Sequence, residues 1–144
     1  MKSTAIGEGG TTYVLVFDKG DEVMENLTRF VSEHGLTAGH FTAIGAFEKV
    51  TLGFLDPDTK EYVPITIDEQ VEALSIVGDI SLENDEPRVH AHVVVGKRDG
   101  SAHGGHLLEA HVWPTLEVVL TESPAHLRRR VDPDTGLPLI FLDA

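Results

Sequence analysis

The sequence has 144 residues, a size at which one ordinary domain buries roughly 70% of the surface that its unfolded chain would expose. Hydrophobic residues make up 41% and charged residues 24% of the chain, which is the composition of a folded globular protein and not of a disordered or fibrous one. The formal net charge of −13 counts against nucleic-acid binding, because a duplex is bound chiefly by Lys and Arg, and 11 of these stand against 24 Asp and Glu.

The sequence contains no cysteine, which excludes disulfides, thiolate zinc sites and cysteine nucleophiles. Histidines and carboxylates therefore remain as the strong metal ligands. No apolar run approaches the roughly 18 residues that a membrane-spanning helix needs, and no hydrophobic signal core follows the first four residues. We expect a cytoplasmic protein with no membrane partner.

The beginning of the chain predicts one strand and one helix. Residues 11–17 are β-branched and aromatic and predict a strand, which Lys19 and Gly20 interrupt. Asp21 is placed as the helix N-cap and Gly35 as the C-terminal stop. Between them, apolar positions recur at helical spacing: Val23, Met24, Leu27, Phe30, Val31 and His34.

Short β-like runs follow, separated by turn residues at 56–59, 84–87 and 98–100. The expected strands are residues 39–45, 47–55, 61–67, 72–82, 88–95, 106–113 and 115–121. Because the connections are short and no second helix makes crossovers, the sheet should be largely antiparallel. We predict an α+β fold with one principal helix packed on the sheet, in a single domain over residues 1–144 with its core at about 10–122.

The segment 123–144 carries three prolines and is expected to resist regular structure. Its end, residues 137–142, is too apolar for a solvated terminus, so we expect it to dock on this subunit or on its neighbour. The basic run Arg128–Arg130 lacks interleaved aromatic residues and is more often a solvated segment or an interface clamp than a nucleic-acid patch.

Three histidines form a candidate metal site. His90 and His92 are two residues apart in a predicted strand, so both rings project from the same face, although such a pair by itself fits hydrogen-bonded histidines equally well. A glycine-rich turn at residues 100–105 leads into a strand that begins at His106. If the two strands pair antiparallel, the third imidazole reaches the first two. Three histidines with an open fourth position are typical of catalytic or exchangeable metal sites.

The other histidines are interpreted differently. His103 lies in the glycine-rich turn and is either an outer ligand or a solvated residue. His111 is an odd number of residues from His106 and is therefore placed on the opposite face, as a packing residue. His34 and His40 are interpreted as structural, and nothing constrains His126 in the tail.

The sequence resembles the plants-and-prokaryotes-conserved (PPC) domain family. The resemblance covers about residues 10–122 and is carried by residues 45–47, 52–54 and 72–80, by His90-Ala91-His92, and by Gly104-Gly105-His106-Leu107. It implies a mainly antiparallel sheet with one helix, a homotrimer, and in prokaryotic members a metal ion, zinc, held by the histidines that correspond to His90, His92 and His106. In plants the domain accompanies AT-hook segments, and this sequence has no Arg-Gly-Arg-Pro hook, which counts against direct DNA recognition.

Three functional hypotheses remain open. The first is a trimeric metal-binding or interaction module, with a small-molecule ligand at the metal as one partner. The second is a metal-dependent enzyme that uses a zinc-bound water of pKa about 7, for which Glu72, Glu109 and Glu117 are candidate general bases, although a surface or inter-subunit charge is the favoured interpretation of each. The third is a DNA-binding regulator. No phosphate-cradling or dinucleotide motif is present, so nucleotide cofactors have no support.

Overall fold

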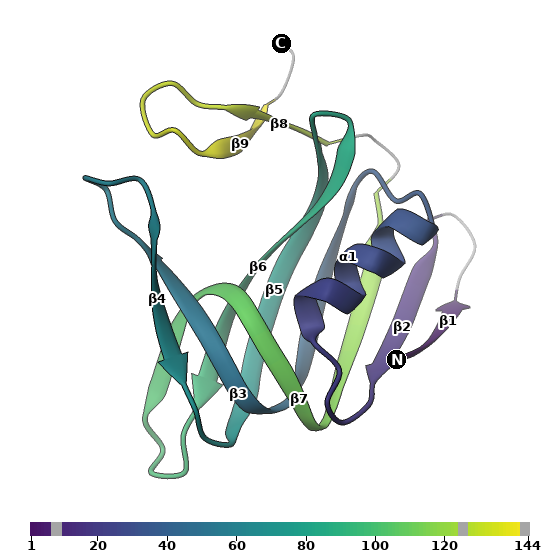
Figure 1. Cartoon of the computed structure of the whole chain (residues 1–144). Helices are drawn as coiled ribbons and strands as arrows, with labels where there is room; N and C mark the ends of the chain where they lie inside the picture. The colour runs from purple at the N-terminus through teal and green to yellow at the C-terminus, as the bar shows by residue number, and fades with distance from the viewer. Residues whose placement is uncertain (7–9, 124–126, 142–144) are drawn as a thin grey trace.

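The structure is a computed structural model that describes residues 1–6, 10–123 and 127–141 of the chain (Figure 1). Its elements are β1 (Lys2–Ile6), β2 (Thr12–Phe17), α1 (Val23–Glu33), β3 (Gly39–Leu55), β4 (Tyr62–Ile67), β5 (Val71–Glu83), β6 (Glu86–Gly96), β7 (Ala102–Glu122), β8 (Arg128–Val131) and β9 (Pro138–Phe141). All of these strands belong to one sheet, whose pairs are antiparallel except that between β5 and β8. The predicted α+β fold, with a mostly antiparallel sheet and one helix, is confirmed. Within the described residues, no helix is long and apolar enough to cross a membrane.

Two strands are longer than predicted. The expected strands at 39–45 and 47–55 are one strand, β3, and those at 106–113 and 115–121 are one strand, β7, which already begins at Ala102. Three irregularities of register along the β3–β7 pair let these long strands bend without ending. Gly104 and Gly105 therefore lie within β7 and not in a turn. The turn comes earlier in the chain, where Gly100 donates its backbone N–H to the Lys97 carbonyl.

Four strands close into a ring, which positions the start of β7. β3 pairs with β5, β5 with β6, β6 with the first residues of β7, and β7 returns to β3. As a result His106 has His92 of β6 directly opposite it on one side and Gly53 of β3 opposite it on the other. The inner face of the sheet carries the core, to which β3 contributes Phe41, Phe47 and Leu52.

The helix packs on the inner face against β6 and β7 through Val23, Leu27, Phe30 and Val31. Gly35 ends it as predicted, at φ +62°: its N–H donates to Ser32 O while that of Leu36 donates to Val31 O. The N-cap prediction was wrong by one residue.

Glu22, and not Asp21, caps the helix, because its carboxylate accepts from the N–H of Glu25 and also from that of Ala110 on β7. One side chain thus fixes the helix start and ties it to the sheet. Asp21 instead accepts from the backbone N–H of Asp18 and pairs with the N-terminal amine of Met1.

The prediction that the C-terminal segment resists regular structure was also wrong, because β8 and β9 form a hairpin. Pro133 lies in its turn and Pro138 is the first residue of β9, positions at which a missing N–H costs little. The hairpin joins the sheet through the β5–β8 pair, and its turn is tied to the β3–β4 turn by Lys60, whose Nζ lies 2.9 Å from the carbonyl oxygen of Asp134. Figure 1 shows the hairpin standing apart from the helix-covered part of the sheet.

At the start of β7, glycine allows the backbones of β7 and β3 to approach each other closely. A Cβ at Gly105 would lie 2.8 Å from the carbonyl oxygen of Gly53. The Gly105→Ala substitution should therefore lower the free energy of unfolding by about 1–3 kcal/mol, because β3 or β7 must shift to admit the methyl group.

The matched control is Gly96→Ala, whose Cβ would meet carbons of the Leu74 side chain at 3.1–3.3 Å. That side chain is 53% exposed and can rotate away, so the cost should be smaller. Urea unfolding of both variants measures the difference. Equal losses would contradict the close-approach argument.

Candidate metal centre

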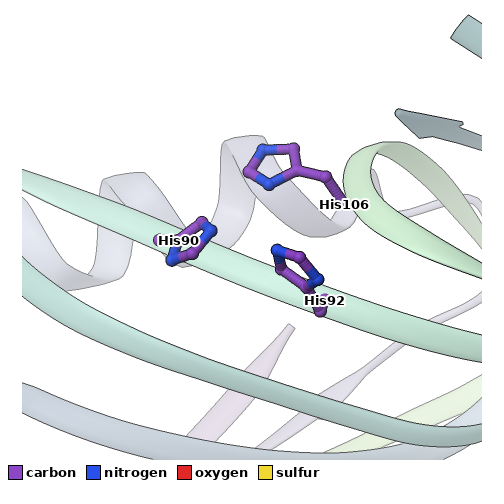
Figure 2. A group of neighbouring side chains, drawn as sticks. All are labelled: His90, His92 and His106. Carbon is purple, nitrogen blue, oxygen red and sulfur yellow. The ribbon is translucent and has the colours of Figure 1, made fainter. Parts of the chain in front are cut away.

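The structure brings His90, His92 and His106 together. His90 and His92 project from β6, and His106 reaches toward them from β7 (Figure 2). The three ring centroids are 5.0–5.4 Å apart, and each ring offers one nitrogen within 4.8 Å of the others. The predicted convergence of the three rings is thus observed, while ligation of a metal by them stays a prediction.

The spacing of the rings is compatible with a metal ion after a small contraction. Zinc–nitrogen bonds of about 2.0–2.1 Å in a tetrahedral site hold ligand nitrogens about 3.3 Å apart. The rings stand at the ends of side chains with two rotatable bonds, so small rotations can close the remaining distance.

Asp79 orients His90. The residue lies directly across the β5–β6 pair from His90, and its Oδ2 is 3.2 Å from Nδ1 of that ring. Burial alone would raise the pKa of Asp79, but hydrogen bonds from His90 and Arg129 hold this pKa below its ordinary value. An ionised carboxylate only accepts, so Nδ1 of His90 donates in its contact with Asp79, which leaves the lone pair of a neutral ring on Nε2. Nη2 of Arg129, which can only donate, also lies 3.3 Å from this Nδ1 and competes with that arrangement.

Arg129 of the β8–β9 hairpin holds Asp79 in turn. Its Nη2 donates to Asp79 Oδ1 at 2.6 Å, its Nε to Ser81 Oγ at 2.6 Å, and its Nη1 to the Pro138 carbonyl at 2.8 Å. The side chain is only 8% exposed, so these charge-assisted bonds form with little competing water. The hairpin and the orientation of His90 are therefore linked through one guanidinium group.

His106 and His92 are neutral at physiological pH. Burial, followed by the charges of His90 and His92, lowers the pKa of His106 to about 4. Burial and His90 also lower the pKa of His92, against an opposing effect of Asp79. Neutral imidazoles keep the lone pairs that metal ligands need.

His106 also carries a buried nitrogen without a partner. Among the described residues its Nδ1 has no hydrogen-bond acceptor or donor, and the ring of Tyr62 stacks on it at a centroid distance of 4.5 Å. A buried polar atom left unpaired costs free energy unless something else supplies the interaction. The donor set therefore fits a divalent ion better than it fits a hydrogen-bonded cluster that is complete by itself.

The three histidines line a pocket of about 420 Å³. Its remaining walls come from β3, β4, β6, β7 and the hairpin, and include two arginines: Gly53, Phe54, Leu55, Tyr62, Arg88, Gly105, Arg129, Leu137, Pro138 and Leu139. No Asp or Glu occurs among these described lining residues. The cluster is thus accessible from a mostly apolar cavity.

The remaining histidines lie outside the cluster. His103 is exposed and paired with Val95, and His34 hydrogen-bonds the Phe30 carbonyl and stacks on its ring. His40 is exposed on β3, and His126 lies outside the described residues. His111 pairs with Glu109 at 2.8 Å.

The argument that placed His111 on the opposite face from His106 does not hold. Leu107 and Ala110 are both buried although they are three residues apart, because the register shifts between them. The alternation of faces is therefore reset at this bulge. His106 and His111 both avoid the core, yet only His106 belongs to the cluster.

The three candidate general bases are not among the lining residues of this pocket. Glu72 and Glu117 line a separate pocket beside Ile44 and Leu74, and Glu109 accepts from His111. Sequence reasoning missed Asp79 and Arg129.

The turn signal could have found Asp79. A two-residue turn at Asn84-Asp85 pairs residues whose numbers sum to 169, which places Asp79 opposite His90. No local pattern indicates that Arg129, which is remote in sequence, lies beside them.

The chain is similar to one protein family and to several solved structures. The family model of the Plants and Prokaryotes Conserved domain, abbreviated PCC or PPC, matches residues 4–124. A metal-containing protein from Archaeoglobus fulgidus is 36% identical, with a TM-score of 0.84 and coverage of 99% of this chain and 100% of that chain. A Bacteroides thetaiotaomicron protein provisionally described as DNA-binding is 32% identical, with a TM-score of 0.89 and 96% of each chain covered.

A plant- and prokaryote-conserved protein from Pyrococcus horikoshii is 28% identical, with a TM-score of 0.85 and coverage of 99% of this chain and 96% of that chain. No curated protein sequence matches this chain significantly.

The Arg129→Ala substitution should lower the free energy of unfolding by about 2–3 kcal/mol, because it leaves the ionised Asp79 without its buried partner. Arg128→Ala is the matched control. Arg128 is exposed and pairs with exposed Asp85, so its loss should cost less than about 1 kcal/mol. Denaturant unfolding of both variants tests the difference, and similar losses for the two would show that Arg129 does not anchor the hairpin.

Proposed function

Because this chain belongs to the Plants and Prokaryotes Conserved domain family, we propose that it is a trimeric metal-binding domain whose His90, His92 and His106 hold a divalent ion, zinc, at a site open to a small molecule. The observation that carries the proposal is the convergence of three imidazoles around the buried, unpartnered Nδ1 of His106. The similar protein from Archaeoglobus fulgidus, which is described as metal-containing, supports it.

Three histidine ligands leave one position of a tetrahedral ion free, and the cluster faces the 420 Å³ pocket. When bound, the ion would supply Lewis acidity at that position. The chain itself orients His90 through Asp79 and limits water around the rings with Tyr62 and the hairpin. The arrangement supports an exchangeable site and not a closed structural one.

The structure offers less support for a hydrolytic enzyme. A metal-assisted hydrolysis needs a group that moves a proton at the open position. The predicted bases Glu72, Glu109 and Glu117 are not among the residues described in the pocket wall, and Asp79 is already engaged with His90 and Arg129. We therefore place binding at the metal ahead of catalysis.

Direct DNA binding is the least supported function, although one similar protein carries that provisional description. The three arginines of the basic run are used within the chain. Arg129 is buried against Asp79, Arg128 pairs with Asp85, and Arg130 lies over the ring of Phe141 at 3.6 Å. With a net charge of −13, few cations remain for phosphates.

The trimer is supported by an exposed apolar sheet face, defined here as the outer face. It consists of Ile44, Leu74, Val77, Val94 and Val119. Thr42 pairs with both Val77 and Val119, and Val77 pairs with His92, so the outer face adjoins the metal cluster. A contiguous apolar face of this kind is typical of a subunit interface.

Leu139, Ile140 and Phe141, which the sequence predicted to dock, are also exposed in the single chain, while Leu142 lies outside the described residues. Docking of these residues on a neighbouring subunit is part of the proposal.

Purified protein that has never met chelator or acid should contain about one divalent ion per chain. His106→Ala should lose the ion, because it removes the ligand contributed by β7, whereas His103→Ala should keep it, because His103 is exposed outside the cluster. Elemental analysis measures both. Well-folded wild-type protein that holds no metal and takes up no added zinc would disprove the ligand assignment.

Light scattering should give the mass of three 15.7 kDa chains. Val77→Asp should lower this mass, because it places a charge on a side chain that is 57% exposed in the single chain and buried in the proposed interface. Gln70→Asp adds the same charge in the exposed β4–β5 turn and should leave the mass unchanged. A wild-type monomer at all working concentrations would rule out the trimer.

A further inference from the structure

We propose that the pocket beside the three histidines binds a small carboxylate with an apolar body, its carboxylate held between Arg88 and the metal. This inference rests on the metal centre proposed above and names the class of ligand that the centre takes. It follows from three properties of the pocket: its size, the chemistry of its walls and the sign of its charged groups.

The size and the walls favour a small organic molecule. A volume of about 420 Å³ lies within the usual range of about 300–1,000 Å³ for small-molecule sites. Much of the wall is apolar, with Phe54, Leu55 and Tyr62 from β3 and β4 and with Leu137 and Leu139 of the hairpin segment. Phe54 is 65% exposed in the single chain. Its ring is thus available to a hydrocarbon or aromatic group.

The charged groups of the pocket are all positive in the described residues. Arg129 and Arg88 line it, and no carboxylate accompanies them there. Arg129 already uses three of its five N–H donors on Asp79, Ser81 and the Pro138 carbonyl, and its side chain is only 8% exposed. Arg88 is 53% exposed, and its pair with Glu83 engages Nη1 at 2.9 Å, which leaves further N–H donors of the guanidinium for a ligand. Arg88 is therefore the cation that an anionic ligand would meet.

A monoanion with an apolar body matches both parts of the pocket. A carboxylate can accept two hydrogen bonds from a guanidinium and can also bind a divalent ion. A phosphate or a polyanion would have to lose strongly bound water against the apolar wall, which is costly. A neutral apolar molecule would leave the remaining N–H donors of Arg88 and the open metal position without a partner.

The test uses metal-loaded wild-type protein, with the metal content of every sample measured first. The probes are 3-phenylpropionate, its neutral amide and acetate, and calorimetry measures their binding. Cobalt(II) in place of zinc gives a visible spectrum that reports on the open position. We expect 3-phenylpropionate to bind at least about tenfold more tightly than either other probe, because only it offers both a charge and an apolar body.

Arg88→Met should weaken 3-phenylpropionate by about tenfold or more, while Arg98→Met, on the exposed β6–β7 turn, should not. Phe54→Ser should weaken 3-phenylpropionate and leave acetate unchanged. Equal binding of the amide, or an unchanged affinity in Arg88→Met, would overturn the inference. Full metal content without any probe binding would overturn this inference alone, whereas absent metal would overturn the proposed function.

Discussion

The carboxylate of Asp79 joins the β5–β6 hairpin to the C-terminal hairpin, which is remote from it in sequence. It accepts from His90 on the neighbouring strand and from Arg129 of the C-terminal hairpin, and Arg129 continues to Ser81 and to the carbonyl of Pro138. One ionised group thereby contacts the ring of a proposed ligand and holds the hairpin that walls the pocket. The ring of strands brings the histidines together, and this interaction orients the ring of His90.

The local elements followed well from the sequence, because they depend on short-range chemistry. The helix was predictable from its apolar spacing and from Gly35, and the clustering of His90, His92 and His106 from alternation on one strand and a returning neighbour. The limits came from irregularities of register. The bulge between Leu107 and Ala110 reverses which side chains of β7 face the core. Counting the residues between His106 and His111 therefore assigned His111 to the wrong face.

The contacts that support the histidines were less predictable from the sequence than the helix and the strands were. Asp79 was within reach of a register argument from the turn at Asn84-Asp85, since a two-residue hairpin fixes the cross-strand partners up to the first bulge, which lies beyond Ser75. Arg129 was not, because its position depends on a parallel pairing of β8 with the end of β5 that no local pattern encodes. The apolar side chains of Leu139, Ile140 and Phe141 are exposed in the single chain and would be covered only in the proposed assembly.

The family model ends at residue 124, whereas Arg129 lies beyond it in the hairpin. A sequence can therefore retain the whole recognisable domain, with all three histidines, and still lack the guanidinium that neutralises Asp79. Relatives with different C-terminal segments would share the ligands but differ in the contacts of the carboxylate beside the position of His90. Variation after the recognised domain is thus a means by which evolution could tune the affinity of the same three ligands without changing any of them.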